Sequence, residues 1–223
     1  MLGDGLAGVA ADVTRPSEVI RLFETAADES GRIDILINNA GLVIKKRLAE
    51  TTDEDYERAF AVNARAPFLT MREASRRIED GGRIVNVVTS ILAFTIPHHS
   101  VYAGSKGAVE HFSKALAKEL GQRGVTVNCV APGPLDTPFY YPVETDESIA
   151  GAKSRSIGNR LAEIQDVVPL IGFLLPARER LDHCANGSRE RRHGVGRAPG
   201  AQLLKADVQE RVPCVRLTNT GHA

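Results

Sequence analysis

The chain has 223 residues, and its 28 Lys and Arg side chains balance its 28 Asp and Glu side chains, so the formal net charge is zero. This length allows one α/β domain with a full core or two small ones, and the charge balance favours neither nucleic acid nor an anionic membrane as a partner. No apolar run approaches the roughly 20 residues of a membrane-spanning helix. The Cys and His spacings fit neither a zinc site nor a disulfide framework. We therefore expect no metal, and we expect a cytoplasmic location.

The first third of the chain alternates between apolar runs and amphipathic stretches. A short apolar run predicts a strand at 6–13, and a helix follows at 17–31, capped by Ser17 and ended by Gly31. The β-branched segment 33–41 predicts a buried strand that runs into a turn.

The middle third is predicted as a long helix and a strand. The helix covers 51–82, with Thr52 or Asp53 as its cap, and Pro67 is expected to kink it. The apolar segment 83–90 predicts the next strand.

The last patterned third repeats the alternation. A helix is predicted at 101–121, ended by Gly121, then a strand at 125–134 and an amphipathic helix at 164–175. We interpret residues 1–176 as one incomplete Rossmann-like domain. The segment 177–223 has no sustained period, and we expect it to be an irregular, poorly ordered tail.

Strands and helices in this order predict right-handed crossovers and a doubly wound parallel sheet with helices on both faces. Ligands bind such sheets at the carboxyl ends of the strands. Polar or turn residues stand at those ends in this sequence, namely Asp12, Asn38–Asn39, Thr89–Ser90 and Pro132–Gly133. The pattern therefore predicts a ligand-binding edge.

Tyr102 and Lys106 lie four residues apart on the predicted helix 101–121, so they share one face. An ammonium group there would stabilise a tyrosinate. Lowering the ordinary Tyr pKa of about 10 by two to three units corresponds to about 3–4 kcal/mol. The spacing alone is a weak signal, because most such pairs are ordinary helix-surface residues. The motifs at the ends of the neighbouring predicted strands strengthen the functional interpretation of the pair.

The chain resembles the short-chain dehydrogenase/reductase family over roughly residues 6–175. The resemblance is carried by short motifs in the family's order and spacing, namely "DV" at 12–13, "NNAG" at 38–41, "VN" at 62–63, "TS" at 89–90, "YAGSK" at 102–106 and "PGPLDT" at 132–137. Each motif is short, and their order and spacing together are specific.

The resemblance implies a role for each matching residue. Asp12 and Val13 would flank the adenine of a nicotinamide cofactor, NAD or NADP. Asn39, Ala40 and Gly41 would line that cofactor, and Pro132, Gly133 and Thr137 would seat its nicotinamide end. The catalytic set would be Asn63, Ser90, Tyr102 and Lys106. Tyr102 would exchange a proton with an alcohol or carbonyl substrate, Lys106 would lower its pKa and bind the ribose, and Asn63 would hold a relay water.

The hydroxyl of the catalytic set has two candidates. The family usually places its serine thirteen residues before the tyrosine, which is the position of Thr89, while Ser90 stands one residue nearer. Loop length varies easily, and we favour Ser90 because the family uses serine.

Two departures from the family pattern stand out. No strand and glycine-rich turn precede residue 6, so strands 1 and 2 of the order 3-2-1-4-5-6 are expected to be missing, and NAD cannot be told from NADP. We expect the strand at 6–11, within the apolar run 6–13, to move beside that at 33–37, or an exposed edge to remain. The tail after Pro176 is also atypical, and a shifted reading frame would explain it.

Three hypotheses for function follow from the sequence. The favoured one is an NAD(P)-dependent oxidoreductase that interconverts an alcohol and a ketone. The second is a truncated, non-catalytic remnant, and the third is a cofactor sensor, which would not need the catalytic set. The resemblance also implies a homodimer or homotetramer formed by the helices at 52–78 and 103–120.

Overall fold

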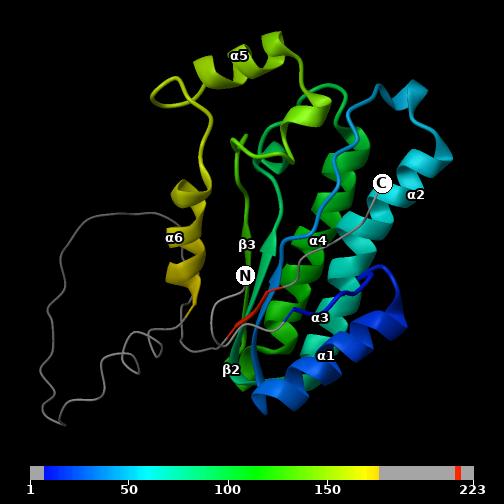
Figure 1. Ribbon diagram of the computed structural model, residues 1–223, viewed down its shortest axis with the longest axis vertical. Helices are drawn as coiled ribbons and strands as arrows, with labels where there is room; N and C mark the ends of the chain where they lie inside the picture. The colour runs from blue at the N-terminus through cyan, green and yellow to red at the C-terminus, as the bar shows by residue number, and fades with distance from the viewer. Residues whose placement is uncertain (1–7, 176–213, 217–223) are drawn as a thin grey trace, which may run out of the picture.

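The computed structural model describes residues 8–175 and 214–216 of the chain. Its centre is a parallel sheet of four strands in the order β3–β2–β1–β4 (Figure 1). The strands are β1 (Ile33–Asn38), β2 (Ile78–Val87), β3 (Thr126–Val130) and β4 (Cys214–Arg216). The predicted Rossmann-like α/β class is confirmed, and the three strands expected at 33–41, 83–90 and 125–134 are neighbours in the predicted order.

The strand predicted at 6–11, in the apolar run 6–13, is wrong for the part that the structure describes, because residues 8–12 form no strand. This segment is held by side chains instead. Arg21 Nη2 donates to the Ala10 carbonyl at 2.6 Å, and the Asp12 carboxylate accepts from the Thr14 N–H at 3.0 Å. A chain that turns at Asp12 and is tied to the following helix cannot run alongside a strand.

The edge of β1 is paired with β4, from Ile35 opposite Cys214 to Ile37 opposite Arg216. In the family's strand order, that position belongs to strand 1. Neither the expected move of the 6–13 segment nor the expected open edge occurs at this position. The strand β4 also departs from the prediction of an irregular tail, while the rest of 177–223 lies outside the described residues.

Helix α1 (Pro16–Ser30) begins one residue before the predicted Ser17 cap, because proline suits the first helical position, where no N–H bond is needed. Its end is as predicted. Gly31 has a φ of 74°, and its N–H donates to the Ala27 carbonyl.

The long helix expected at 51–82 is divided into α2 (Asp53–Phe60), the π-helical turn η2 (Ala61–Arg65) and α3 (Ala66–Arg77). Thr52 caps α2 in a capping box with Asp55. The wide turn η2 comes just before Pro67, whose ring and missing N–H disturb the helical bonding. The helix also ends five residues earlier than predicted, since Ile78 is already extended and starts β2.

Helix α4 (Ser100–Glu119) matches its prediction except at its end. Gly121 does not form the stop, because the chain continues into the 3-10 turn η4 (Gly121–Arg123), and Gly124 is the left-handed residue, with a φ of 67°. The remaining elements are η1 (Leu48–Glu50), η3 (Ser90–Leu92), η5 (Tyr141–Val143), α5 (Asp146–Ser154) and α6 (Ile164–Leu174).

Helices α1, α3 and α4 lie on one side of the sheet, and α6 lies on the other (Figure 1). The core joins α1 and α3 to the sheet through residues such as Val19, Phe23, Leu36, Leu69 and Ile84. Within the described part of the chain, no helix is long and apolar enough to cross a membrane. The sheet therefore presents the carboxyl ends of β1, β2 and β3 at one edge, where the loops after them meet.

Candidate active site

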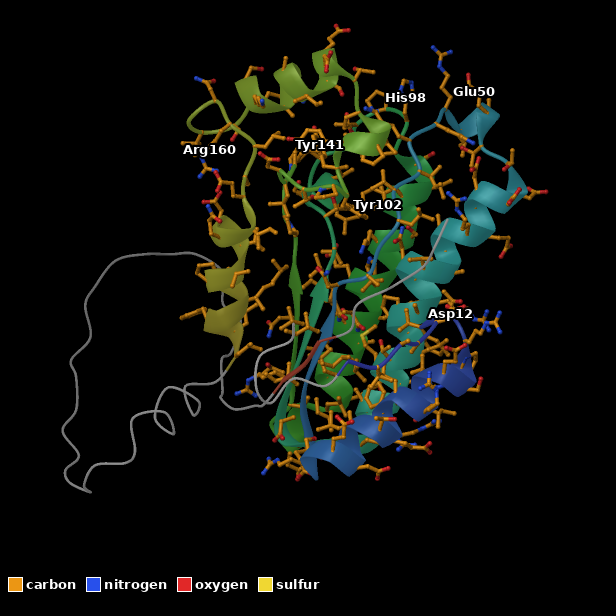
Figure 2. All side chains as sticks on the ribbon, in the orientation of Figure 1. Asp12, Glu50, His98, Tyr102, Tyr141 and Arg160 are labelled. Atoms are coloured by element: carbon orange, nitrogen blue, oxygen red, sulfur yellow. The ribbon has the colours of Figure 1, made fainter. Side chains whose placement is uncertain are left out.

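The sequence motifs gather at the carboxyl edge of the sheet. The loop after β1 carries Asn39 to Gly41, the loop after β2 carries Thr89 and Ser90, and the loop after β3 carries Pro132 to Thr137. Figure 2 shows Tyr102 beneath Tyr141 and His98 near this end of the molecule. The predicted ligand-binding edge therefore coincides with the N-terminal turns of α4.

Asn63 lies on the π-helical turn η2, and its side chain is completely buried. Its amide accepts from the Leu42 N–H at 2.7 Å and donates to the Leu42 carbonyl at 2.7 Å and to Ser105 Oγ at 3.0 Å. All the bonds in this set are made to the loop after β1 and to α4. Asn63 therefore locks the loop to the helix that carries Tyr102.

Gly41 explains why that loop can approach α4 so closely. A Cβ atom on Gly41 would lie 3.4 Å from Lys106 Nζ, 3.5 Å from Asn63 Oδ1 and 3.6 Å from Phe139 Cζ. A larger side chain would therefore fill the space between these groups. The structure thus brings Gly41, Asn63 and Lys106 together.

Lys106 is almost fully buried, and its Nζ donates to the Val87 carbonyl at 2.8 Å, at the end of β2. Burial disfavours the charged ammonium and lowers the pKa of Lys106 to about 8. At neutral pH the side chain still carries most of its charge.

Tyr102 is 7% exposed. Burial raises the pKa of Tyr102, and a hydrogen bond with the Thr89 hydroxyl lowers it to a smaller extent. Lys106 was expected to lower this pKa, but its ammonium is directed to the Val87 carbonyl, and desolvation of the phenol has the larger effect. The phenol therefore stays protonated at neutral pH.

The two candidate hydroxyls face different neighbours. Thr89 is buried, and its hydroxyl interacts with Tyr102. Ser90 is half-buried, its N–H donates to the Pro132 carbonyl at 3.0 Å, and its Oγ lies 3.9 Å from the position of a Cβ on Gly133. Thr89, at the family's usual spacing, thus takes the place beside the phenol, and Ser90 lies against the loop after β3.

Val13, one of the two residues expected to flank the adenine, lines a small hollow at this edge. Asn39 and Ala40 line it as well, together with Asn38, Ala66, Pro67 and Thr70. Asp12 stands beside Val13, and its pKa is lowered chiefly by hydrogen bonds from the Thr14 hydroxyl and N–H. The Asp12 carboxylate therefore remains charged at neutral pH beside Val13.

Thr137 opens the segment that covers the site, residues 137–148, which we call the arm. The Thr137 carbonyl accepts from the Tyr140 N–H at 3.0 Å, and Phe139 reaches back to Gly41. Lys45 Nζ lies 2.6 Å from Glu144 Oε2, and both side chains are largely buried. No local sequence pattern indicates this pair, because its members are 99 positions apart.

The basic run 45–47 is engaged in ion pairs. Lys45 pairs with Glu144 in the arm, Lys46 Nζ lies 2.6 Å from Asp55 Oδ2, and Arg47 Nε lies 4.0 Å from Glu50 Oε1. These partners neutralise the run, so it is not a patch of free positive charge at the mouth of the site.

The close approach of Gly41 to Lys106 fits the nicotinamide end of a dinucleotide, whereas the hollow at Val13 marks the expected adenine side but is smaller than the ring. Among residues 8–175 and 214–216, no glycine-rich turn joins a strand directly to a helix at this edge, so the pyrophosphate contacts of the fold are not represented there. In the same described ranges, no three His, Cys, Asp or Glu side chains gather as metal ligands would.

A parallel α/β sheet with a buried Tyr–Lys pair, a buried Asn and a hydroxyl at its carboxyl edge defines the class of Rossmann-like oxidoreductase folds. A family model described as enoyl-(acyl carrier protein) reductase matches residues 2–181. A short-chain type dehydrogenase/reductase of Picea abies is 42% identical over 179 residues, which is 77% of this chain and 66% of the relative. The chain belongs to the short-chain dehydrogenase/reductase family.

Two further relatives support this membership. An NADPH-dependent aldehyde reductase-like chloroplastic protein of Arabidopsis thaliana is 40% identical over 74% of this chain and 63% of its own length. The crystal structure of a putative dehydrogenase of Burkholderia cenocepacia with bound NADP has a TM-score of 0.71 and 43% identity, over 74% of this chain and 64% of that one. The chain thus spans about two thirds of the length of the relatives it matches.

Proposed function

We propose that the protein is an NAD(P)-dependent oxidoreductase that interconverts an alcohol and a carbonyl compound, with Tyr102 as the acid and base. The observation that carries this proposal is the burial of Tyr102 and Lys106 side by side at the carboxyl edge. A buried phenol and a buried ammonium one helical turn apart are unfavourable for packing alone, because both lose hydration.

Tyr102 is suited to donate a proton. Its pKa is raised by burial, so the phenol holds its proton at neutral pH and can pass it to a carbonyl oxygen within hydrogen-bond reach. We infer that Thr89 is the hydroxyl that orients the phenol.

Lys106, Gly41 and Asn63 act on the other partner of the reaction. The bound nicotinamide cofactor would supply the hydride. Lys106 would offer its ammonium to the ribose, Gly41 leaves room for close approach of the backbone, and Asn63 keeps the loop after β1 in place. Asp12 and Val13 would flank the adenine. Asn39 and Ala40 would line the cofactor, and Pro132, Gly133 and Thr137 would seat its nicotinamide end.

We propose NADP(H) as the first cofactor to test. The Burkholderia structure holds NADP, and the Arabidopsis relative is named NADPH-dependent. NAD(H) belongs in the same experiment, because the residues that distinguish the two cofactors are not identified in this chain.

The chain is further proposed to form a homo-oligomer through α3 and α4. Phe68 on α3 and Phe112 on α4 are partly exposed and pack together, with ring centroids 5.9 Å apart. The guanidinium of Arg72 lies 5.6 Å from the Phe68 ring centroid. Exposed aromatic and Arg side chains that adjoin one another are typical of interface cores.

A non-catalytic remnant is the second candidate. It is supported by the lack of a glycine-rich strand–helix turn among the described residues, since that turn makes most contacts to the pyrophosphate. Such a chain would keep the arrangement around Tyr102 and bind the cofactor weakly or not at all.

Turnover of the Tyr102→Phe variant tests the proposal. Oxidation of NADPH and of NADH is followed with a panel of ketones and aldehydes for the wild type and for the variant. We expect the variant to lose at least about 100-fold in kcat, the usual contribution of a positioned acid. The matched control Tyr56→Phe, on α2, should keep its activity. Equal rates for Tyr102→Phe and wild type would remove Tyr102 from the mechanism.

A further inference from the structure

The turn that leads into α4 has an unusual backbone. His98 has a φ of 68°, the left-handed region that non-glycine residues rarely occupy. The His98 carbonyl accepts from the Lys46 N–H at 2.9 Å, a bond from the loop after β1. Strained residues persist where the surrounding structure holds them, and they cluster at functional sites.

The strained turn places the next residue, His99, inside the protein. The His99 side chain is 5% exposed, although the residues before it are exposed. Its Nδ1 lies 2.9 Å from the Pro97 carbonyl oxygen. Because a carbonyl can only accept, Nδ1 carries the hydrogen, and this bond fixes the orientation of the ring. The His99 carbonyl in turn accepts from the Ala103 N–H at 2.8 Å, in the first turn of α4.

The imidazole is held against the phenol ring of Tyr102. The two ring centroids are 6.3 Å apart and the planes meet at 64°, an edge-to-face contact. Tyr102 is therefore covered by His99, which comes three residues earlier in the chain, and it contacts Thr89 in the loop after β2. The contact is distinct from the hydrogen bonds of Asn63. Asn63 donates to Ser105 Oγ, and Ser105 Oγ donates to the backbone carbonyl of Tyr102, so these bonds do not involve the phenol ring.

We propose that His99 is a positioning residue for Tyr102, whose imidazole covers the phenol ring, excludes water from it and fixes its orientation. The consequence for turnover rests on the proposed function, whereas the covering of the phenol does not. His98 contributes the backbone turn, and its exposed side chain has no part in the contact.

Few groups affect the pKa of the Tyr102 phenol, so the effect of His99 on that pKa can be measured separately. Burial raises the pKa of Tyr102 and the Thr89 hydroxyl lowers it, and no carboxylate of the described residues contributes. Lys106 is one helical turn away, with its ammonium on the Val87 carbonyl. Removal of the imidazole would therefore act through hydration of the phenol.

The test is a titration of the four tyrosines by NMR with isotope-labelled tyrosine, in which Tyr102→Phe identifies the Tyr102 signal. In His99→Ala, water reaches the phenol, and the Tyr102 pKa is expected to fall toward its ordinary value. His99→Phe keeps a ring at this position and is expected to restore the raised pKa. His99→Gln keeps a donor for the Pro97 carbonyl without a ring, so it should behave like His99→Ala even if the alanine variant is poorly folded.

His98→Gly is the matched control, because glycine accepts the left-handed backbone and leaves His99 intact. We expect it to leave the Tyr102 pKa unchanged. An unchanged pKa in both His99→Ala and His99→Gln, or an equal shift in His98→Gly, would overturn the proposal.

Turnover gives the second readout. His99→Ala should lower kcat by about tenfold without changing the affinity for NADPH, and His99→Phe should recover most of the loss. A shifted phenol pKa with wild-type kcat would overturn the positioning role. If the wild type itself shows no turnover, the proposed function fails, and the titration alone decides whether His99 covers Tyr102.

Discussion

The polar side chains behind Tyr102 are buried and bonded to the backbone, whereas most side chains of residues 131–175 face solvent. In the first region, Asn63, Ser105 and Lys106 each have partners within 3.0 Å. In the second, only Ala152 and Leu161 are buried. The two regions therefore differ in how firmly their side chains are held. We expect the frame around Tyr102 to be rigid, and we expect the arm and α6, which are held by a few contacts, to open at little cost.

Ion pairs take the place of core packing in the second region. Lys45 and Glu144 join the arm to the loop after β1, and the Arg160 guanidinium binds Asp166 at the start of α6, at 2.7 Å. The pair at Arg160 is exposed, and such pairs contribute little, typically about 0–1 kcal/mol. The ion pair between Lys45 and Glu144 is mostly buried, so it contributes more than the Arg160 pair to holding the arm against the loop after β1.

The largest expected effect concerns Asn63. Asn63→Ala removes the side-chain partner of the Leu42 N–H and of the Leu42 carbonyl in a partly buried place. We expect a loss of about 3 kcal/mol in the free energy of unfolding, measured with urea. The control Asn128→Ala, on the half-buried strand β3, loses a single 3.3 Å bond and should cost less than about 1 kcal/mol. Equal losses of unfolding free energy in Asn63→Ala and Asn128→Ala would contradict the distinction between the frame and its surroundings.

The next effect concerns Lys106 and pH. Its folded pKa is about 8, below its unfolded value of 10.5, so between these values the unfolded chain binds a proton that the native protein does not. Stability from this group therefore rises as pH increases from 8 to 10, by about 2 kcal/mol. Tyr102, with a raised pKa, acts in the opposite direction only above about pH 10.

Urea midpoints at pH 8 and at pH 9.5 measure this rise. Lys106→Met should lack it, and Lys118→Met, on the exposed side of the same helix, should keep it. A rise of equal size in Lys106→Met would mean that Lys106 is hydrated in solution.

A smaller effect is expected at the arm. Glu144→Gln removes the partner of Lys45 and the charge that Ser148 Oγ contacts. We expect about 1 kcal/mol of lost stability and faster hydrogen exchange confined to residues 137–155. The control Glu50→Gln breaks only the exposed 4.0 Å contact with Arg47 and should change neither. Faster exchange spread over α4 in Glu144→Gln would show that the arm and the frame are one unit.

The smallest effect is expected on α6. Phe173 is 71% exposed, so Phe173→Ser should change the free energy of unfolding by less than about 0.5 kcal/mol. Leu69→Ala, in the core, provides the contrast and should cost about 2–5 kcal/mol. A large loss for Phe173→Ser would mean that another surface covers α6 in solution.

The fold class and the gathering of the site were predictable because both follow from order along the chain. Parallel strands place their carboxyl ends at one edge, so Gly41, Thr89 and Pro132 had to lie near Tyr102 once the strands were identified. Contacts between distant segments were not predictable. No local pattern announces that Lys45 meets Glu144 or that Asn63 binds Leu42.

Local geometry accounts for the remaining errors. Thr89 rather than Ser90 meets the phenol, because Ser90 begins the turn η3 and lies against the loop after β3. The strand expected near Asp12 is absent because a side-chain hydrogen bond turns the chain there. Both outcomes depend on a single residue's bonds, which hydrophobic periodicity does not report.

Cofactor binding tests the central claim most directly, namely that the buried Tyr102–Lys106 pair belongs to a working nicotinamide site. Isothermal titration with NADPH and with NADH is carried out on the wild type and on Lys106→Met, with Lys118→Met as the control. The account predicts submillimolar binding of at least one cofactor by the wild type and by Lys118→Met, weakened at least about tenfold in Lys106→Met. No binding of either cofactor at millimolar concentration by the wild type would contradict it.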